Sequence, residues 1–281
     1  RRQQNPQCGG NMQEKTYTAE LGKIVYWRSD ATDPSKPWII FLPGLTADHR
    51  LFDKQVVHFK DMANLLVWDP PSHGISRPFP LKWTMDDLAK WLHQICGYEG
   101  IDKPILVGQS MGGYAAQAYM NIFPDSVSGF VSIDSCPLKR CYFTSCELML
   151  LKHTKLMYLS IPWKLLIAWG STGCATSEYG QALMRKMMES YSKHEYCDLA
   201  AHGYRIVAEA VESGRDFDIS CPALLLCGTK DMAGSAKNYN KRWTNAAGIP
   251  LLWIEGAGHN SNTDDPEAVN KAIENFMDAL S

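Results

Sequence analysis

One serine of the chain lies in a context typical of a catalytic nucleophile. The segment GQSMGG contains the pattern Gly108-x-Ser110-x-Gly112. This pattern alone arises by chance in roughly one in ten chains of this size. Here, however, it directly follows the apolar run PILVG at 104–108 and opens a predicted helix over 110–123. A strand, a tight turn and a helix in that order lift a serine hydroxyl clear of a sheet. We therefore interpret Ser110 as a nucleophile rather than as a helix N-cap.

A serine nucleophile needs a base, and the base needs an acid that orients it. Of the eight histidines, only His259, in WIEGAGHNSN, directly follows an apolar run on the last strand–helix connection. Asp231 follows the run PALLLCG, and Asp134, at the end of VSID, is the rival acid. Asp231 has a structural alternative as a cap for the helix that begins near Ser235. All the candidates come just past the ends of predicted parallel strands, where open α/β sheets bind ligands.

A further strand end supplies backbone donors rather than a side chain. The segment FLPGLTADH follows the first long apolar run. We expect the N–H of Leu45 to bind an oxyanion together with the N–H of Met111, the residue after the serine. His49, at the end of this segment, is expected near the pocket but has no visible partner. His73, in DPPSHGIS, is expected to be a turn residue.

Short apolar runs that end in Gly, Pro or Asp are the elements that position these groups. They occupy residues 38–44, 64–70, 104–108, 129–134, 222–228 and 250–256. Such runs predict strands that are buried on both faces, as in parallel sheets. Helical patterns alternate with them at 51–62, 84–96, 110–123 and 266–280. Strands that alternate with helices predict a parallel sheet with right-handed crossovers. Upstream, residues 16–27 predict an antiparallel hairpin that turns at Leu21-Gly22.

Residues 137–214 interrupt this alternation with a long stretch that has helical patterns and no strand signal. We expect them to form a helical cap, while residues 12–136 and 215–281 form the α/β core. The cap is expected to be a mobile lid that sets substrate choice. Its candidates for an apolar or aromatic pocket lining are Met149, Met157, Tyr158, Trp163 and Trp169. The same residues at helical spacing also fit simple packing within the cap.

From about Lys15 to Ala279 the chain resembles the α/β-hydrolase fold family. The matching pieces are FLPGLTADH, WDPPSHGIS, VGQSMGG, CGTKD and GAGHNSN. The departures are Pro43-Gly44 where the family often has His-Gly, and Ser72 where a glycine is common. The resemblance implies a mostly parallel eight-stranded sheet flanked by helices, with a helical cap. A serine at the elbow argues against the family's epoxide hydrolase and haloalkane dehalogenase branches, which attack with a carboxylate.

The favoured interpretation is a serine hydrolase that cleaves a small carboxylic ester, lactone or thioester through an acyl-enzyme. Ser110, Asp231 and His259 are then the catalytic triad, and no metal or organic cofactor is implied. The alternatives are a carbon–carbon bond hydrolase with the same triad and a ligand-sensing binding protein that keeps the triad. The expected ligand is an apolar or aromatic small molecule, and the oligomeric state stays open.

Composition excludes several other classes of protein. The 281 residues carry 28 basic and 30 acidic side chains, so the net charge is −2, which argues against a general nucleic-acid binder. No apolar run is long enough for a membrane span, because lysines interrupt the most apolar region, residues 148–169. The nine cysteines match no zinc spacing and predict free thiols in a reducing cytoplasm. Residues 1–11 are expected to be a disordered tail or not native, with Met12 as the natural start.

Overall fold

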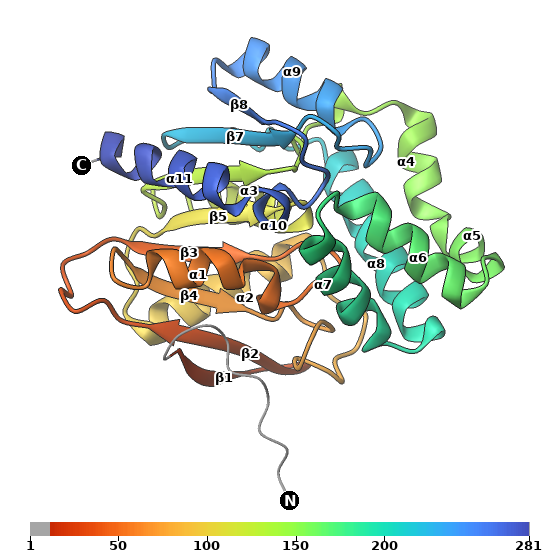
Figure 1. Ribbon diagram of the computed structural model, residues 1–281, viewed down its shortest axis with the longest axis horizontal. Coiled ribbons are helices and arrows are strands. Elements are labelled where there is room, and N and C mark those ends of the chain that lie inside the picture. The colour runs from red at the N-terminus through yellow and green to blue at the C-terminus, as the bar shows by residue number, and fades with distance from the viewer. Residues whose placement is uncertain (1–11, 281) are drawn as a thin grey trace, which may run out of the picture.

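A sheet of eight strands runs through the computed structural model, which describes residues 12–280 (Figure 1). The predicted tail over 1–11 lies outside the described residues. The strands are β1 Gln13–Ala19, β2 Gly22–Ser29, β3 Trp38–Leu42, β4 Asn64–Trp68, β5 Ile105–Gln109, β6 Gly129–Ile133, β7 Ala223–Gly228 and β8 Leu251–Ile254. Their order across the sheet is β1-β2-β4-β3-β5-β6-β7-β8. The pairs β1–β2 and β2–β4 are antiparallel and all other neighbours are parallel. The predicted α/β class and mostly parallel eight-stranded sheet are confirmed.

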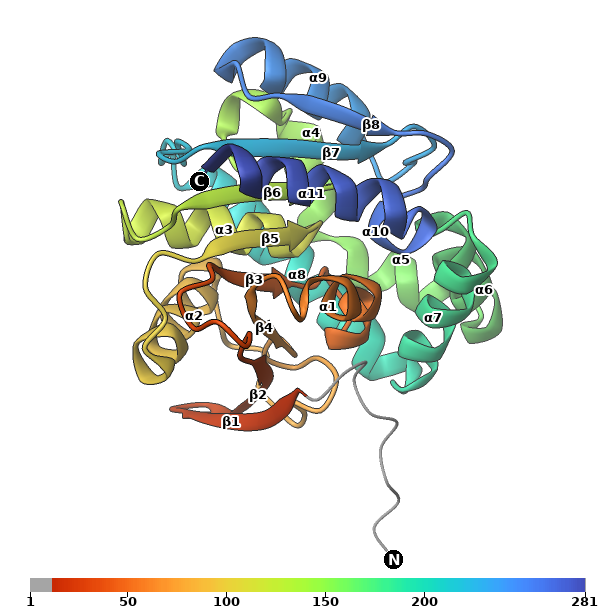
Figure 2. The same cartoon turned by 60° about the vertical axis from the view of Figure 1, so that its left-hand side comes forward.

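Helices cover both faces of the sheet, which is why its central strands are buried and mainly apolar. Every residue of β4, β5 and β6 is buried. The helices of this part of the chain are α1 Asp53–Phe59, α2 Met85–Glu99, α3 Met111–Ile122, α9 Ala236–Ala247, α10 Ser261–Asp264 and α11 Pro266–Leu280. The helices α1 and α11 lie on one face and α2 and α3 on the other (Figures 1 and 2). Such two-sided cover leaves only the strand ends open for a site.

The N-terminal hairpin differs from its prediction by one residue. Ala19 pairs with Gly22, so the turn consists of Glu20 and Leu21 rather than Leu21 and Gly22. A two-residue turn suits the twist of an antiparallel hairpin. Gly22 instead starts β2, where Phe79 lies so close that a Cβ would be 2.7 Å from its ring.

Between β6 and β7, all regular secondary structure of the described chain is helical. This region contains residues 137–214, the segment predicted as an insertion. The helices are α4 Ser145–Lys152, α5 Thr154–Ser160, α6 Trp163–Cys174, α7 Glu178–Glu189 and α8 Lys193–Glu212, after a short 3-10 helix at Arg140–Tyr142. We call α4–α8 the lid. Capping boxes begin α4 and α8, where Thr144 and Ser192 each pair reciprocally with a glutamate three residues on. The lid lies beyond the carboxyl ends of the parallel strands (Figure 1).

None of the helices in the described range combines the length and the apolar character that a bilayer crossing requires.

Candidate active site

Ser110 occupies a strained turn between β5 and α3. Its backbone has φ 49° and ψ −117°, a conformation that side chains rarely adopt. The neighbouring glycines make room for this turn. A Cβ on Gly108 would lie 2.5 Å from the backbone of Gly112, and one on Gly112 would lie 1.9 Å from the carbonyl oxygen of Leu42. The pattern Gly-x-Ser-x-Gly is therefore required by close backbone packing around the serine.

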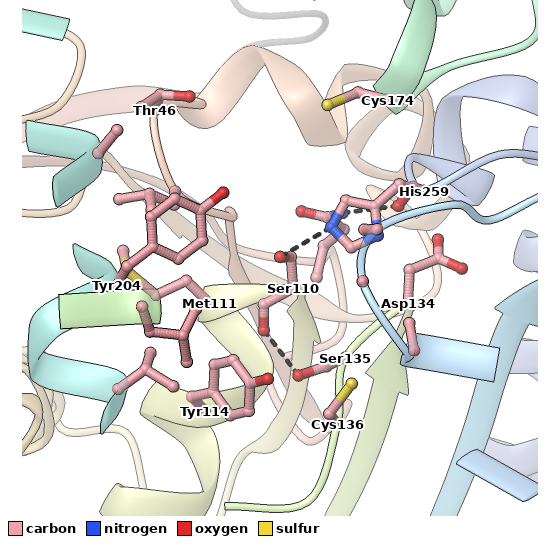
Figure 3. Close-up of a pocket in the computed structure, with 18 of the residues that line it drawn as sticks. Thr46, Ser110, Met111, Tyr114, Asp134, Ser135, Cys136, Cys174, Tyr204 and His259 are labelled. Atoms are coloured by element: carbon pink, nitrogen blue, oxygen red, sulfur yellow. Dashed lines mark hydrogen bonds between the residues drawn. The ribbon is translucent and has the colours of Figure 1, made fainter. Parts of the chain in front are cut away.

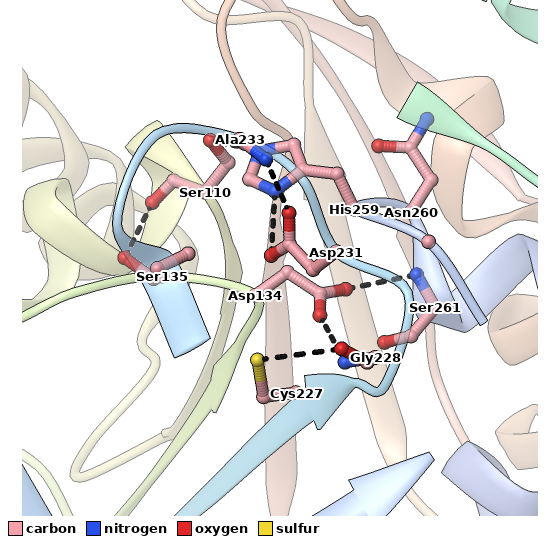
Figure 4. Close-up of polar contacts among 12 residues, drawn as sticks. Ser110, Asp134, Ser135, Cys227, Gly228, Asp231, Ala233, His259, Asn260 and Ser261 are labelled. Carbon is pink, nitrogen blue, oxygen red and sulfur yellow. Dashed lines mark hydrogen bonds and ion pairs between the residues drawn. The ribbon is translucent and has the colours of Figure 1, made fainter. Parts of the chain in front are cut away.

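The structure brings Ser110, His259 and Asp231 into one chain of hydrogen bonds (Figure 4). The Nε2 atom of His259 is 2.9 Å from the Oγ of Ser110, and its Nδ1 is 3.0 Å from a carboxylate oxygen of Asp231. The second Asp231 oxygen accepts the N–H of Ala233 at 2.8 Å. The Asp231 side chain is fully buried, whereas 14% of the His259 side chain is exposed. This is the geometry in which an imidazole can remove a hydroxyl proton while a carboxylate fixes its tautomer.

The charge balance around His259 favours its protonated form. Burial by itself lowers the pKa of His259, but the Asp231 carboxylate outweighs burial and raises that pKa above its ordinary value of 6.5. The ring is therefore a stronger base than a free imidazole.

Asp134, the rival acid of the sequence analysis, does not hydrogen-bond to the His259 ring. Its two carboxylate oxygens accept the backbone N–H groups of Gly228 and Ser261, each at 2.8 Å (Figure 4). Burial and the nearby Asp231 carboxylate raise the pKa of Asp134 to about 7. Asp134 thus ties the end of β7 to the start of α10, and the segments that carry Asp231 and His259 are held together through it.

The backbone groups expected to bind an oxyanion lie beside the serine. A Cβ on Gly44 would lie 3.1 Å from the Cβ of Ser110, so the segment that leads into Leu45 passes directly against this serine. Among the residues that the structure describes, the N–H groups of Leu45 and Met111 have no hydrogen-bond partner. Both donors are thereby available to a ligand.

Two supporting side chains had no sequence signal. The amide of Gln109 donates to the carbonyl oxygen of His259 at 2.7 Å. The hydroxyl of Ser135 donates to the carbonyl oxygen of Ser110 at 2.7 Å (Figure 3). Gln109 and Ser135 thus fix the backbone of His259 and of Ser110 rather than their side chains.

A third supporting residue, Asp264, joins the lid to the segment around His259, residues 255–260, which we call the histidine loop. Its carboxylate accepts N–H groups from Gly258, Thr176 and Ser177 at 2.8–2.9 Å.

The serine opens into a cavity of about 450 Å³ between the sheet and the lid (Figure 3). Its wall is largely apolar and includes Met111, Leu151 and Val207, together with five tyrosines, Tyr114, Tyr158, Tyr196, Tyr204 and Tyr239. Of the five residues expected to line the pocket, only Tyr158 does so. Met149, Met157 and Trp169 are more than half exposed, and Trp163 packs against Tyr196 instead. Helical spacing marks a lid helix but does not show which of its faces meets the cavity.

The remaining histidines near the strand ends have structural partners. His49, expected to have none, contacts Asp69 with both its backbone N–H and its Nδ1 at 2.8 Å, and its ring packs on Trp27. The prediction of an unpaired His49 was wrong because the strand end that carries Asp69 lies next to it. His73 is buried in a turn, as expected, and burial lowers its pKa to about 4.

Two groups of side chains have the residue types of a metal site. They are Asp48 with His49 and Asp69, and Asp134 with Cys227 and Asp231. In both groups the carboxylates already accept internal donors: Asp69 from His49 and Ile75, Asp134 from two backbone N–H groups, and Asp231 from His259. The donor sets are therefore those of hydrogen-bond networks.

Comparison with known proteins gives one family match and several relatives. A family model described as "Alpha/beta hydrolase family" matches residues 39–272. The 2-(acetamidomethylene)succinate hydrolase of Mesorhizobium japonicum is 24% identical over 87% of this chain and 89% of its own length. The 2-succinyl-6-hydroxy-2,4-cyclohexadiene-1-carboxylate synthase of Pectobacterium atrosepticum is 26% identical over 88% of this chain and 96% of its own. Among solved structures, a thermophilic esterase from Thermogutta terrifontis superposes with a TM-score of 0.75 at 19% identity, over 96% of this chain and 99% of its own.

Proposed function

The chain belongs to the alpha/beta hydrolase family, and from this premise we propose that it is a serine hydrolase acting through an acyl-enzyme. The proposed substrate is a small carboxylic ester, lactone or thioester. The observation that carries the proposal is the continuous relay from Ser110 through His259 to Asp231, with distances of 2.9 and 3.0 Å, at a cavity beyond the strand ends. The hydrolase class itself agrees with the family and with the hydrolases among its relatives.

The first half-reaction transfers the acyl group to the enzyme. Ser110 Oγ attacks the carbonyl carbon while His259 Nε2 takes the hydroxyl proton. Asp231 holds the imidazolium that forms. The N–H groups of Leu45 and Met111 bind the oxygen of the tetrahedral intermediate. They stabilise its negative charge without having to reorient, because the backbone already holds them in place. Collapse of the intermediate expels the alcohol, hydroxyl or thiol, which receives the proton from His259.

The second half-reaction returns the free enzyme. His259 removes a proton from water, and the resulting hydroxide attacks the acyl carbon in the same oxyanion site. Ser110 leaves with the proton held by His259, and a carboxylic acid is released. The net change is the addition of one water across the bond that is cleaved.

The substrate fits an apolar or aromatic small molecule, because the cavity wall is mainly aliphatic and aromatic. The names of the two curated relatives above refer to small carboxylate compounds. We also propose a reducing compartment, the cytoplasm. The eight cysteines of the described range support this, because they are free thiols.

An activity screen tests this function. Wild type and Ser110→Ala would be assayed on 4-nitrophenyl esters of increasing acyl length, on lactones, on thioesters and on vinylogous β-diketones. We expect multiple turnovers on one of the first three classes and a loss on the order of 10⁴-fold or more in Ser110→Ala. Turnover of the diketones alone would indicate carbon–carbon hydrolysis, and a single stalled turnover would indicate a sensor. Either result would overturn the proposal.

A further inference from the structure

The charges around the cavity point to a narrower substrate class than the triad alone defines. We infer that the substrate of the hydrolase proposed above has no carboxylate and bears a second, uncharged oxygen that reaches the tyrosine pair of the lid. This inference rests on the proposed function and specifies what enters the same site.

Apart from the catalytic His259, the described cavity lining has no side chain that can carry a positive charge and receive an anion. Among its lining residues, all within the described part of the chain, there is no lysine or arginine. Its acidic lining residues are Glu147 and Asp134, and Asp231 lies just behind His259. A carboxylate at the far end of the substrate, away from His259, leaves water without gaining a countercharge, which is costly in an apolar surrounding.

Glu147, at the start of α4, keeps a fixed negative charge on the wall. Burial alone would raise the pKa of its carboxyl, but hydrogen bonds from Tyr239 and Thr144 outweigh burial and lower that pKa. One oxygen accepts both the N–H and the hydroxyl of Thr144 at 2.7 Å, and the other accepts the hydroxyl of Tyr239. Glu147 is therefore a carboxylate at neutral pH, and it repels a second one.

A pair of tyrosines in the lid supplies a hydrogen-bond donor for the second oxygen of the substrate. The hydroxyls of Tyr158, on α5, and Tyr204, on α8, are 3.2 Å apart, and their rings stack at 6.2 Å between centroids. The pair has two hydroxyl hydrogens and uses one of them internally. In the described chain we find no acceptor for the other. Burial raises the pKa of Tyr204 well above its ordinary value, so the hydroxyl stays a donor.

This free donor faces the reacting serine across the cavity. Figure 3 shows the Tyr204 side chain entering the cavity from the lid, on the side opposite His259. A donor in a largely apolar wall is satisfied by a carbonyl, ether or hydroxyl oxygen of the ligand. The two relatives described above are named for a succinate and a carboxylate, and such a group meets Glu147 rather than a cation in this chain.

The test uses three acyl groups of similar length on one chromogenic leaving group. They are the 4-nitrophenyl esters of hexanoic acid, of adipic acid and of monomethyl adipate, which differ only at the far end. For wild type we expect kcat/KM on the methyl ester to exceed that on the free acid by about 100-fold, because of desolvation and repulsion. Equal values, or a preference for the free acid, would overturn the inference while leaving the proposed function intact.

Two variants assign the effect to the residues named. Glu147→Gln should lower the ratio of kcat/KM on the methyl ester to kcat/KM on the free acid about tenfold, because hydrolysis of the free acid improves. The helix start stays intact, since glutamine also forms a capping box. Tyr204→Phe should lower kcat/KM on the methyl ester about tenfold more than kcat/KM on the hexanoate ester. Tyr142→Phe, at a buried tyrosine outside the cavity lining, is the matched control. A uniform loss on all three esters in Tyr204→Phe would contradict the role of the pair.

The failure of the proposed function would be distinct from the failure of this inference. If wild type hydrolysed none of the three esters and Ser110 took up no serine-directed phosphonate, the hydrolase itself would be wrong.

Discussion

The backbone N–H of Asn260 donates to the carbonyl oxygen of Cys174 at 2.7 Å, which joins the residue after His259 to the last residue of α6. Asp264 strengthens this junction because its carboxylate accepts N–H groups from both Gly258 and Thr176. One end of the lid is thus bonded to the histidine loop. The lid therefore cannot lift from the core at the end of α6 without breaking these bonds.

Asp264→Asn tests this junction. An asparagine presents an amide N–H₂ to one of the N–H groups that the carboxylate now accepts, so a donor faces a donor. We expect a loss of about 1–3 kcal/mol in the free energy of unfolding and a fall in kcat of roughly tenfold as His259 loses its fixed position. Asp265→Asn is the control. The carboxylate of Asp265, just before α11, accepts the N–H of Ala268 at 3.0 Å, and an asparagine oxygen caps a helix equally well. The two variants would be compared by thermal unfolding and by kcat, and identical behaviour would contradict the account.

The roles of the two acids near His259 are separable by the same substitution. Asp231→Asn should lower kcat by about 10³–10⁴-fold, because it removes the carboxylate that sets the tautomer of His259. Asp134→Asn should lower kcat by less than tenfold but reduce the melting temperature, because its oxygens bind only backbone N–H groups. The measurement is kcat and Tm for both variants. A larger kcat loss in Asp134→Asn, with both proteins folded, would reverse the assignment.

The pH dependence of kcat/KM follows from the base. His259 acts only when neutral, and its folded pKa is raised above 6.5 by Asp231. We therefore expect kcat/KM to rise with pH through a midpoint above 6.5 and then level off. The free energy of unfolding changes with pH in the opposite direction. The stabilisation from the pairing of His259 with Asp231 is fully present below pH 6.5 and is lost as pH rises through the folded pKa of His259. Asp231→Asn should move the midpoint of kcat/KM to lower pH, and an unchanged midpoint would argue against the pairing.

Substrate choice should depend on the inner face of α4. Leu151 lines the cavity, whereas Met149 on the same helix is 55% exposed. Leu151→Ala adds space, so the optimum of a 4-nitrophenyl ester series should move to longer acyl chains, by about tenfold in relative kcat/KM. Met149→Ala should leave the optimum where it is. A common decrease on every ester in Leu151→Ala would indicate support of the core rather than selection of substrate.

The sequence is sufficient to predict the sheet and the strand ends that carry Ser110, Asp231 and His259, because each depends on local patterns. Buried strands require apolar runs, and the elbow requires Gly108 and Gly112 at fixed places next to Ser110. Contacts between distant segments have no such pattern. Asp264 and Thr176 are 88 residues apart, and neither lies in a motif. The lining of the cavity was also not predictable, since helical spacing does not tell which face of α4 or α6 turns inward.

Covalent labelling of Ser110 tests the central claim most directly. A serine-directed fluorophosphonate needs the nucleophile, the base and the oxyanion donors together, but no knowledge of the substrate. Intact mass and peptide mapping of the treated protein would locate the adduct. The account predicts one adduct, on Ser110, absent from Ser110→Ala and formed far more slowly in His259→Gln. An adduct on a cysteine, or equal labelling of Ser110→Ala, would contradict it.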